Sequence, residues 1–134
     1  EVGGPDLGVN LYVRDEASGT RKVFWSKALD AGPVAEGASV VASNGAMKAA
    51  VSRDPGALGY LSIGHVDDTV ASASLDGVAA SQENARSGSY PVVRQLYMNT
   101  KGEPRGLTGA FIEYLRGPAC AGIISEKGFI PLAR

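Results

Sequence analysis

Two short segments rich in β-forming residues each run directly into a sequence that starts a helix, and this repeated order limits the fold more than any other feature. Residues 10–14 (NLYVR) lead to residues 18–20 (SGT), and residues 39–42 (SVVA) lead to residues 43–45 (SNG). Serine is favoured at a helix N-cap, and the apolar residues after each serine recur at helical spacing. Two strand-to-helix turns so close together indicate a layered α/β fold rather than an all-β fold.

The rest of the chain continues with extended and helical patterns. The first two helices should end at AGP (31–33) and DPG (54–56), where glycine and proline stop a helix. Extended segments are predicted at 57–66, 69–78 and 90–98, and helices at 81–88, 105–116 and 118–127. Gly128 should end the last helix. The tail at 129–132 is apolar, so it should pack on another part of the protein or on a partner. We therefore predict a mixed sheet of roughly five strands flanked by helices.

Composition limits the classes of function. The 134 residues fit one domain, and an apolar fraction of 44% without a run near the roughly 20 residues of a membrane helix is typical of a globular chain. A net charge of −1 provides no overall field for nucleic acid, so any anion site has to be local. The single cysteine, Cys120, excludes an internal disulfide. Because the first residues carry neither an initiator Met nor an export signal, we expect a trimmed or excised piece.

The segment that follows the first strand has the chemistry of an anion site. A strand that delivers Ser18, Gly19 and Thr20 to the first turn of a helix presents unpaired backbone N–H groups, two hydroxyls and the positive end of the helix dipole. Gly19 allows a ligand to approach the backbone closely. Arg14, at the end of the strand, can bind a phosphate or sulfate oxygen through its planar guanidinium.

Neighbouring residues offer support and a plainer alternative. Asp15 or Glu16 can orient the guanidinium or accept the proton of a protonated oxyanion. In the plainer interpretation Ser18 only caps the helix and Arg14 is a solvated strand end. The segment Ser43-Asn44-Gly45 is a second and weaker candidate of the same kind, for which an ordinary helix cap is again the alternative.

A series of motifs then follows in order along nearly the whole chain. They are RDEASGTR (14–21) with Phe24, SNGA (43–46), PGALGY (55–60), LDGV (75–78), YPVVRQLY (90–97) and GFIPL (128–132). This series resembles the second lobe of the phosphate-binding component of bacterial phosphate ABC transporters, which are periplasmic binding proteins of two α/β lobes. By this resemblance Arg14, Ser18, Gly19 and Thr20 contact phosphate, and Glu16 orients the arginine.

The resemblance also implies a division of the chain and a set of partners. Residues 1–98 would form the second lobe with both crossover strands, and residues 99–134 would form helices that pack on a first lobe, which lies before Glu1 and is absent. Their apolar faces would then pack on this lobe or on a second copy in a homodimer. The implied function is capture of inorganic phosphate or a similar oxyanion for an ABC permease, without a cofactor, in the periplasm or another extracytoplasmic space.

Two enzyme-like interpretations find little support in the sequence. Ser18 as a nucleophile would need His65 as its base and Asp67 or Asp68 to orient it, but nothing in the sequence places His65 near Ser18. His65 with the two aspartates is a partial metal site at best, and such a group is more often a solvated loop. We therefore expect neither catalysis nor a bound metal.

Two other classes of function are nucleic-acid binding and protein interaction or signalling. Phe24, Trp25 and Tyr97 lack a basic stripe around them, so they are interpreted as core and interface residues rather than as a surface for nucleic acid. An interaction or signalling domain of the same fold, with weak or no oxyanion binding, is the serious alternative. The sequence does not say which oxyanion binds. Phosphate keeps a proton near neutral pH and sulfate does not, so the selectivity depends on an acceptor for that proton, such as Asp15, Glu16 or a carboxylate of the first lobe.

Overall fold

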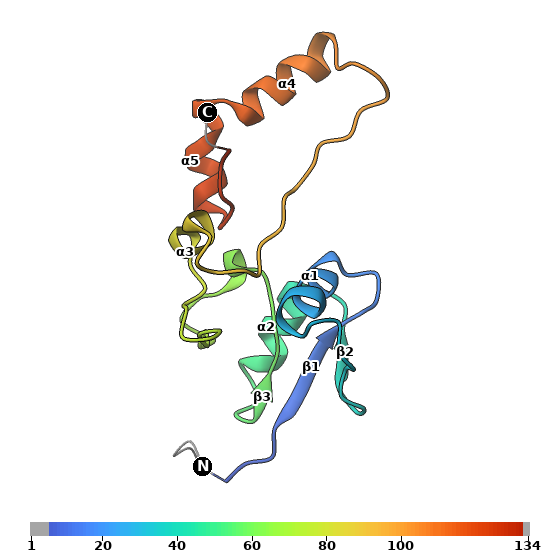
Figure 1. Ribbon diagram of the computed structural model, residues 1–134, viewed down its shortest axis with the longest axis vertical. Coiled ribbons are helices and arrows are strands. Elements are labelled where there is room, and N and C mark those ends of the chain that lie inside the picture. The colour runs from blue at the N-terminus through green and yellow to red at the C-terminus, as the bar shows by residue number, and fades with distance from the viewer. Residues whose placement is uncertain (1–5, 133–134) are drawn as a thin grey trace.

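Strand β1 (Asn10–Arg14) lies at the centre of a small parallel sheet. The computed structural model describes residues 6–132, and in it β1 pairs with β2 (Ser39–Val41) on one side and with β3 (Ala57–Leu58) on the other. Figure 1 shows these strands with the helices around them. Because all three strands are parallel, their carboxyl ends lie at one edge of the sheet, where α/β proteins place their binding sites.

Helices α1 (Gly19–Ala28) and α2 (Asn44–Val51) follow β1 and β2 through short turns, as the sequence predicts. Each begins after a serine whose side-chain oxygen accepts a hydrogen bond from the backbone N–H three residues later, Ser18 for α1 and Ser43 for α2. Both predicted N-caps are therefore confirmed. Their positions bring the N-termini of both helices to the carboxyl edge of the sheet.

The apolar core of this part of the molecule is small. Met47, on the inner face of α2, is fully buried, and a methyl group built on Gly59 would overlap its sulfur. Phe24 of α1 stacks on Tyr60 with ring centroids 4.4 Å apart. These contacts hold α1, α2 and the segment after β3 together.

The sheet has three strands within the described residues, not the predicted five, and it is parallel rather than mixed. Only the first two residues of segment 57–66 pair with β1, and the chain then passes through a short 3-10 helix, η1 (Ile63–His65). Segments 69–78 and 90–98 take no place in this sheet. A strand is stabilised by ladder bonds to a neighbour, so a segment with strand propensity and no such neighbour stays outside the sheet.

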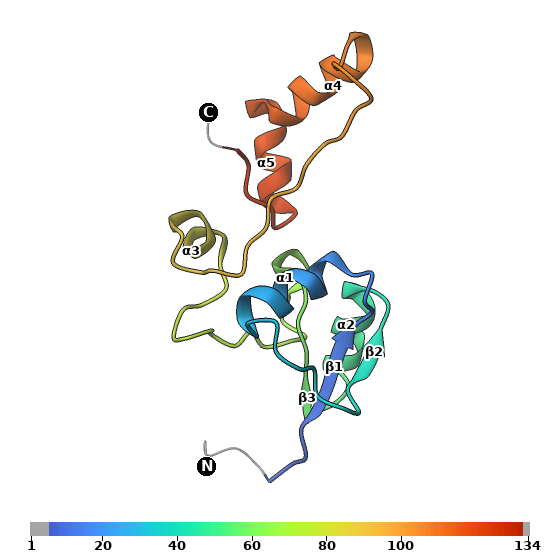
Figure 2. The same ribbon diagram turned by 45° about the vertical axis from the view of Figure 1, so that its right-hand side comes forward.

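Beyond the sheet, α3 (Gln82–Ser87) precedes a long connection, and α4 (Gly106–Arg116) and α5 (Pro118–Glu126) follow it. The positions of all three helices agree with the prediction. We call residues 106–132 the C-terminal arm, and Figures 1 and 2 both show α4 at the far end of the molecule from the sheet. Within the described part of the chain, no helix is both long and apolar enough to cross a membrane.

The C-terminal arm meets the rest of the molecule at the end of α5. Gly128 adopts a positive φ of 80°, and a methyl group on it would overlap the backbone of Gly64 in η1. Gln82 of α3 donates a hydrogen bond from Nε2 to the Ser125 carbonyl oxygen at 2.8 Å. Two glycine backbones in direct contact therefore fix the position of α5, while α4 extends beyond it.

The arm and the connection before it expose much apolar surface. Leu107 of α4 is 87% exposed. Exposed large apolar residues on these segments are Leu96, Tyr97, Met98, Leu107, Phe111, Tyr114, Ile123, Phe129, Ile130 and Leu132. The whole chain exposes 9873 Å², about one and a half times the roughly 6,600 Å² expected for a compact monomer of this size. Within residues 6–132 the apolar side chains of α4 are largely exposed, so packing on this lobe or on a second copy stays a prediction for this helix.

Candidate anion-binding site

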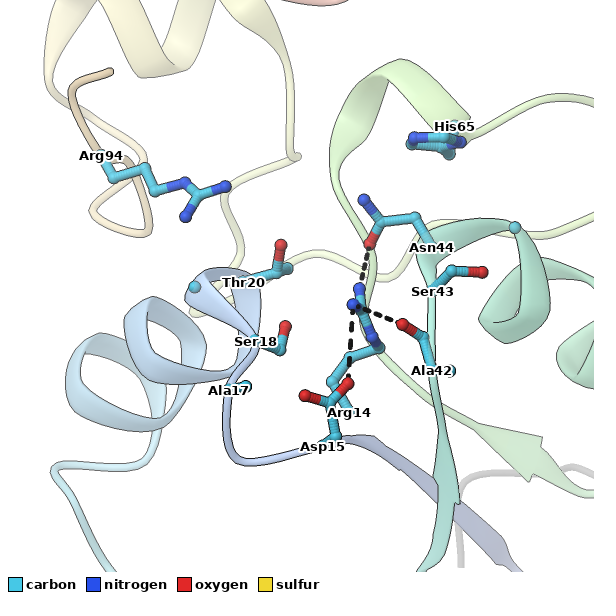
Figure 3. Close-up of a pocket in the computed structure, with 12 residues that line it drawn as sticks. Arg14, Asp15, Ala17, Ser18, Thr20, Ala42, Ser43, Asn44, His65 and Arg94 are labelled. Atoms are coloured by element: carbon cyan, nitrogen blue, oxygen red, sulfur yellow. Dashed lines mark hydrogen bonds and ion pairs between the residues drawn. The ribbon is translucent and has the colours of Figure 1, made fainter. Parts of the chain in front are cut away.

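The N-termini of α1 and α2 face one open pocket at the carboxyl edge of the sheet, with a volume of about 680 Å³ (Figure 3). Its walls come from the β1–α1 turn, the β2–α2 turn, η1 and the segment after α3. The residues that line it are Arg14, Asp15, Ala17, Ser18, Gly19, Thr20, Ala42, Ser43, Asn44, Gly45, His65 and Arg94. All four residues predicted to contact phosphate are among them, and so is the weaker candidate segment 43–45.

The Arg14 side chain is held between the two turns. Its Nη1 donates to Asn44 Oδ1 at 3.0 Å, its Nη2 donates to the Ala42 carbonyl oxygen at 3.0 Å, and Asp15 Oδ2 lies 3.9 Å from Nη2. The side chain is only 11% exposed. These contacts use two of the five guanidinium N–H groups, so the group is fixed in place and still has donors for an oxyanion.

The Arg14 backbone is fixed as well. Its N–H donates to Tyr60 Oη at 3.1 Å, and its carbonyl oxygen accepts from Arg21 Nη1 at 2.7 Å. By contrast, its buried Nε–H has no acceptor within residues 6–132. A buried donor without a partner lowers the stability of the fold by about 1–3 kcal/mol. An apolar side chain at this position would avoid that loss, so packing alone does not explain the arginine.

The first turn of α1 supplies neutral donors. Ser18 is 7% exposed, and because its Oγ accepts from a backbone N–H of α1, its own hydroxyl proton stays available to a ligand. The N–H groups of Gly19 and Thr20 belong to the first turn of the helix, where no carbonyl of the same helix can accept from them. Together with the helix dipole, this turn presents partial positive charge to the pocket.

The second turn forms the opposite wall of the same pocket. Ser43 caps α2, and Gly45 lies in the first turn of that helix. Asn44 accepts from Arg14 on one side and donates from Nδ2 to Ser62 Oγ at 3.3 Å on the other. Segment 43–45 is therefore part of the Arg14 site rather than a separate one, and Asn44 is a residue that positions the guanidinium.

Glu16 lies outside this arrangement. It is exposed in the turn between β1 and α1, which the Ser18 N–H closes by donating to the Asp15 carbonyl oxygen at 3.1 Å. No hydrogen bond or ion pair joins Glu16 to Arg14 in the part of the chain that the structure describes. The contacts that orient Arg14 come from Asn44 and Ala42 with Asp15 nearby, so the role that the resemblance assigns to Glu16 stays a prediction without a contact to support it.

The sequence alone assigns no role to Arg94, which also lines the pocket. The Arg94 guanidinium lies over Gly19, where a methyl group on the glycine would overlap its Nη1 (Figure 3). The neighbouring Val93 is held on α1, because its carbonyl oxygen accepts from Lys27 Nζ at 2.7 Å. A single arginine in the otherwise uncharged segment YPVVRQLY is the only signal in the sequence, and it does not say which helix the segment lies against.

His65 and Ser18 line the same pocket, although nothing in the sequence brings them together. The Ser18 Oγ is nevertheless bonded to the backbone of α1, and no hydrogen bond among the described residues links it to His65. The Lys48 ammonium, 2.7 Å from Asp67, and two hydrogen bonds from Thr69 together lower the pKa of that carboxyl from 3.8 to about 2, so Asp67 is engaged elsewhere. No group of three metal-ligating side chains, with Asp68 or without it, occurs in residues 6–132.

Known proteins are similar to this chain in sequence and in fold. Residues 1–118 match the family model described as PBP superfamily domain. The phosphate-binding protein PstS of Bacillus subtilis is 37% identical, over 98% of this chain and 44% of its own length. An ABC-type phosphate transport receptor from Vibrio cholerae superposes with a TM-score of 0.74 at 30% identity, covering 98% of this chain and 56% of that one.

A solved structure from Clostridium perfringens, described as a phosphate ABC transporter substrate-binding protein with bound phosphate, superposes with a TM-score of 0.85 at 29% identity. It matches 98% of this chain and 55% of its own. The chain thus spans about half the length of the relatives that it matches. On the match of its first 118 residues and on these superpositions, the chain belongs to the PBP superfamily.

Proposed function

We propose that this chain is one lobe of a two-lobed protein that captures inorganic phosphate for an ABC importer, in the periplasm or another extracytoplasmic space, without catalysing a reaction. The observation that carries the proposal is the convergence of two helix N-termini and the fixed Arg14 guanidinium on one pocket. Backbone N–H groups at helix N-termini bind phosphate oxygens well. The relatives described as phosphate-binding or phosphate transporter proteins match nearly the full length of this chain.

Each donor has a distinct part in the proposed complex. Arg14 uses its uncommitted N–H groups on one or two phosphate oxygens, while Asn44 and Ala42 keep the guanidinium from turning away. The Gly19 N–H and the Ser18 hydroxyl bind a further oxygen at the start of α1. The ligand then meets donors already in place, so binding loses little free energy to reorganisation of the protein.

Asp15 is the proposed source of selectivity within this lobe. Its carboxylate lines the pocket beside Arg14, whereas Glu16 does not. A carboxylate can accept the proton of a protonated phosphate, but it repels sulfate, which has no proton to donate. We therefore expect the site to prefer phosphate to sulfate.

We also propose that residues 1–98 form the second lobe and that residues 99–134 cover part of a first lobe. The exposed apolar residues of the C-terminal arm and the excess surface of the chain support this division. A homodimer through α4 is the alternative cover. Size-exclusion chromatography with light scattering separates the two, because a stable monomer of this chain would argue against the dimer.

Calorimetric titration with inorganic phosphate tests the function. If a complete two-lobed cleft binds near 1 μM, or about −8 kcal/mol, half of the shell supplies about −4 kcal/mol and binds near 1 mM. The titration is therefore done on this chain and on the same chain joined to a first lobe. Arg14→Ala should weaken binding by about 1.5–3 kcal/mol in the joined protein, as expected for a lost charged hydrogen bond.

The outcomes distinguish the competing functions. Tight binding by the joined protein that Arg14→Ala weakens supports phosphate capture at this pocket. Tight binding that Arg14→Ala leaves unchanged removes Arg14 from the site. No binding by either protein favours an interaction or signalling domain of the same fold.

A further inference from the structure

Arg94 reaches the pocket from a segment far from Arg14 in sequence. It lies in the long connection between α3 and α4, and two contacts bring that connection onto α1. The first is the hydrogen bond from Lys27 Nζ to the Val93 carbonyl oxygen, and the second is the approach of the Arg94 guanidinium to Gly19. In Figure 3 the Arg94 side chain extends toward the start of α1 from the side opposite Asn44.

The Arg94 side chain is exposed, and its guanidinium lies beside the first residue of α1. A cation at a helix N-terminus meets the positive end of the helix dipole, where anions are stabilised and cations are not. Arg14 adds a second positive group to the same pocket, and Asp15, the carboxylate of the pocket, lies nearer to Arg14. Within residues 6–132 no hydrogen bond or ion pair to a carboxylate compensates Arg94. Two guanidinium groups and a helix N-terminus thus surround one pocket with positive charge, which favours an anion there.

We propose that Arg94 is a second anion-binding residue and that the pocket takes a doubly charged tetrahedral oxyanion, held between Arg14 and Arg94 across the N-terminus of α1. This inference rests on the proposed function and extends it to the charge of the ligand. Lys27 acts as a positioning residue, because its hydrogen bond to Val93 sets where the Arg94 side chain begins.

The test is a titration of the isotope-labelled chain with inorganic phosphate at mildly alkaline pH, followed by amide chemical shifts. Arg94→Gln should weaken binding at least about 10-fold, as for one lost charged hydrogen bond. Arg94→Lys, which keeps the charge and loses the planar fork, should bind with intermediate affinity. The matched control is Arg86→Gln, which removes the same charge from exposed α3 and should bind as the unchanged chain does.

Two further measurements distinguish direct contact between Arg94 and the anion from an indirect effect of the substitution. Lys27→Met should weaken phosphate binding less than Arg94→Gln does. The ratio of phosphate affinity to that of singly charged nitrate should fall in Arg94→Gln, because the second cation matters most for a doubly charged ligand. Equal weakening by Arg86→Gln, or phosphate binding unaltered by Arg94→Gln, would overturn the proposal for Arg94. If the unchanged chain and its two-lobed form both fail to bind phosphate, the proposed function itself is wrong.

Discussion

Gly19→Ala should weaken anion binding without lowering the stability of the protein. Gly19 does not have a positive φ, so its backbone accepts alanine, and alanine favours a helix more than glycine does. Thermal stability should therefore stay equal or rise slightly. A methyl group at this position would, however, occupy the place of the Arg94 guanidinium, next to the backbone that the anion is proposed to approach.

The magnitude follows from what the methyl group displaces. If Arg94 moves off the site, one charged hydrogen bond to the anion is lost, which is worth about 1.5–3 kcal/mol or at least roughly a 10-fold weaker binding. Gly45 provides the matched control, because it also lines the pocket in the first turn of a helix. A methyl group on Gly45 would meet only the Ser43 Oγ at 3.8 Å, an ordinary contact.

The assay compares phosphate affinity and unfolding temperature in both variants. We expect Gly19→Ala to lose affinity and keep its unfolding temperature, while Gly45→Ala keeps both. Phosphate affinity that is unchanged in Gly19→Ala would show that neither Arg94 nor close approach to the backbone at this turn contributes to binding. A loss of the same size in both variants would show that the two helix starts contribute alike, which contradicts an anion centred on α1.

Two further predictions concern the C-terminal arm and acid stability. Gly128→Ala forces alanine into a positive φ, which costs about 1–2 kcal/mol, and also overlaps Gly64, so amide hydrogen exchange in α5 should rise. Gly102→Ala has the same backbone strain in open space and should leave α5 protected; equal exchange in both variants would contradict the contact. Because Lys48 and the hydrogen bonds from Thr69 lower the pKa of Asp67 to about 2, these contacts stabilise the fold above about pH 4 and the stabilisation is lost toward pH 2. Asp67→Asn should remove that part of the pH dependence of the unfolding temperature. An unfolding temperature that still falls equally toward pH 2 in the variant would contradict this role of Asp67.

The local order of the first half of the chain could be predicted because its signals are local. The serines at 18 and 43 cap helices that begin where the sequence indicates, and β1 and β2 precede them as predicted. The pocket residues 14 and 18–20 were also found together, since strand and helix start are only a short turn apart. Such features depend on residues that are close together in sequence, so a single sequence is enough to predict them.

What could not be predicted depends on contacts between distant segments. Segments 69–78 and 90–98 have strand propensity, but membership of a sheet requires a partner strand that propensity does not supply. The sequence offers Asn44 as part of a second candidate segment, but its hydrogen bond to Arg14 and the approach of Arg94 to the pocket depend on how other elements pack on β1 and α1. Of the two acidic residues that the sequence offers as support for Arg14, Asp15 lies beside the guanidinium, while Glu16 is exposed and its role stays a prediction.

The central claim is that an oxyanion binds where the start of α1 meets the Arg14 guanidinium. Chemical-shift changes mapped on the labelled chain during addition of inorganic phosphate show where the anion binds. The largest changes are expected on the backbone amides of residues 18–20 and on the side-chain N–H groups of Arg14, with smaller changes at 43–45. Saturable changes centred elsewhere, with those amides unmoved, would contradict it.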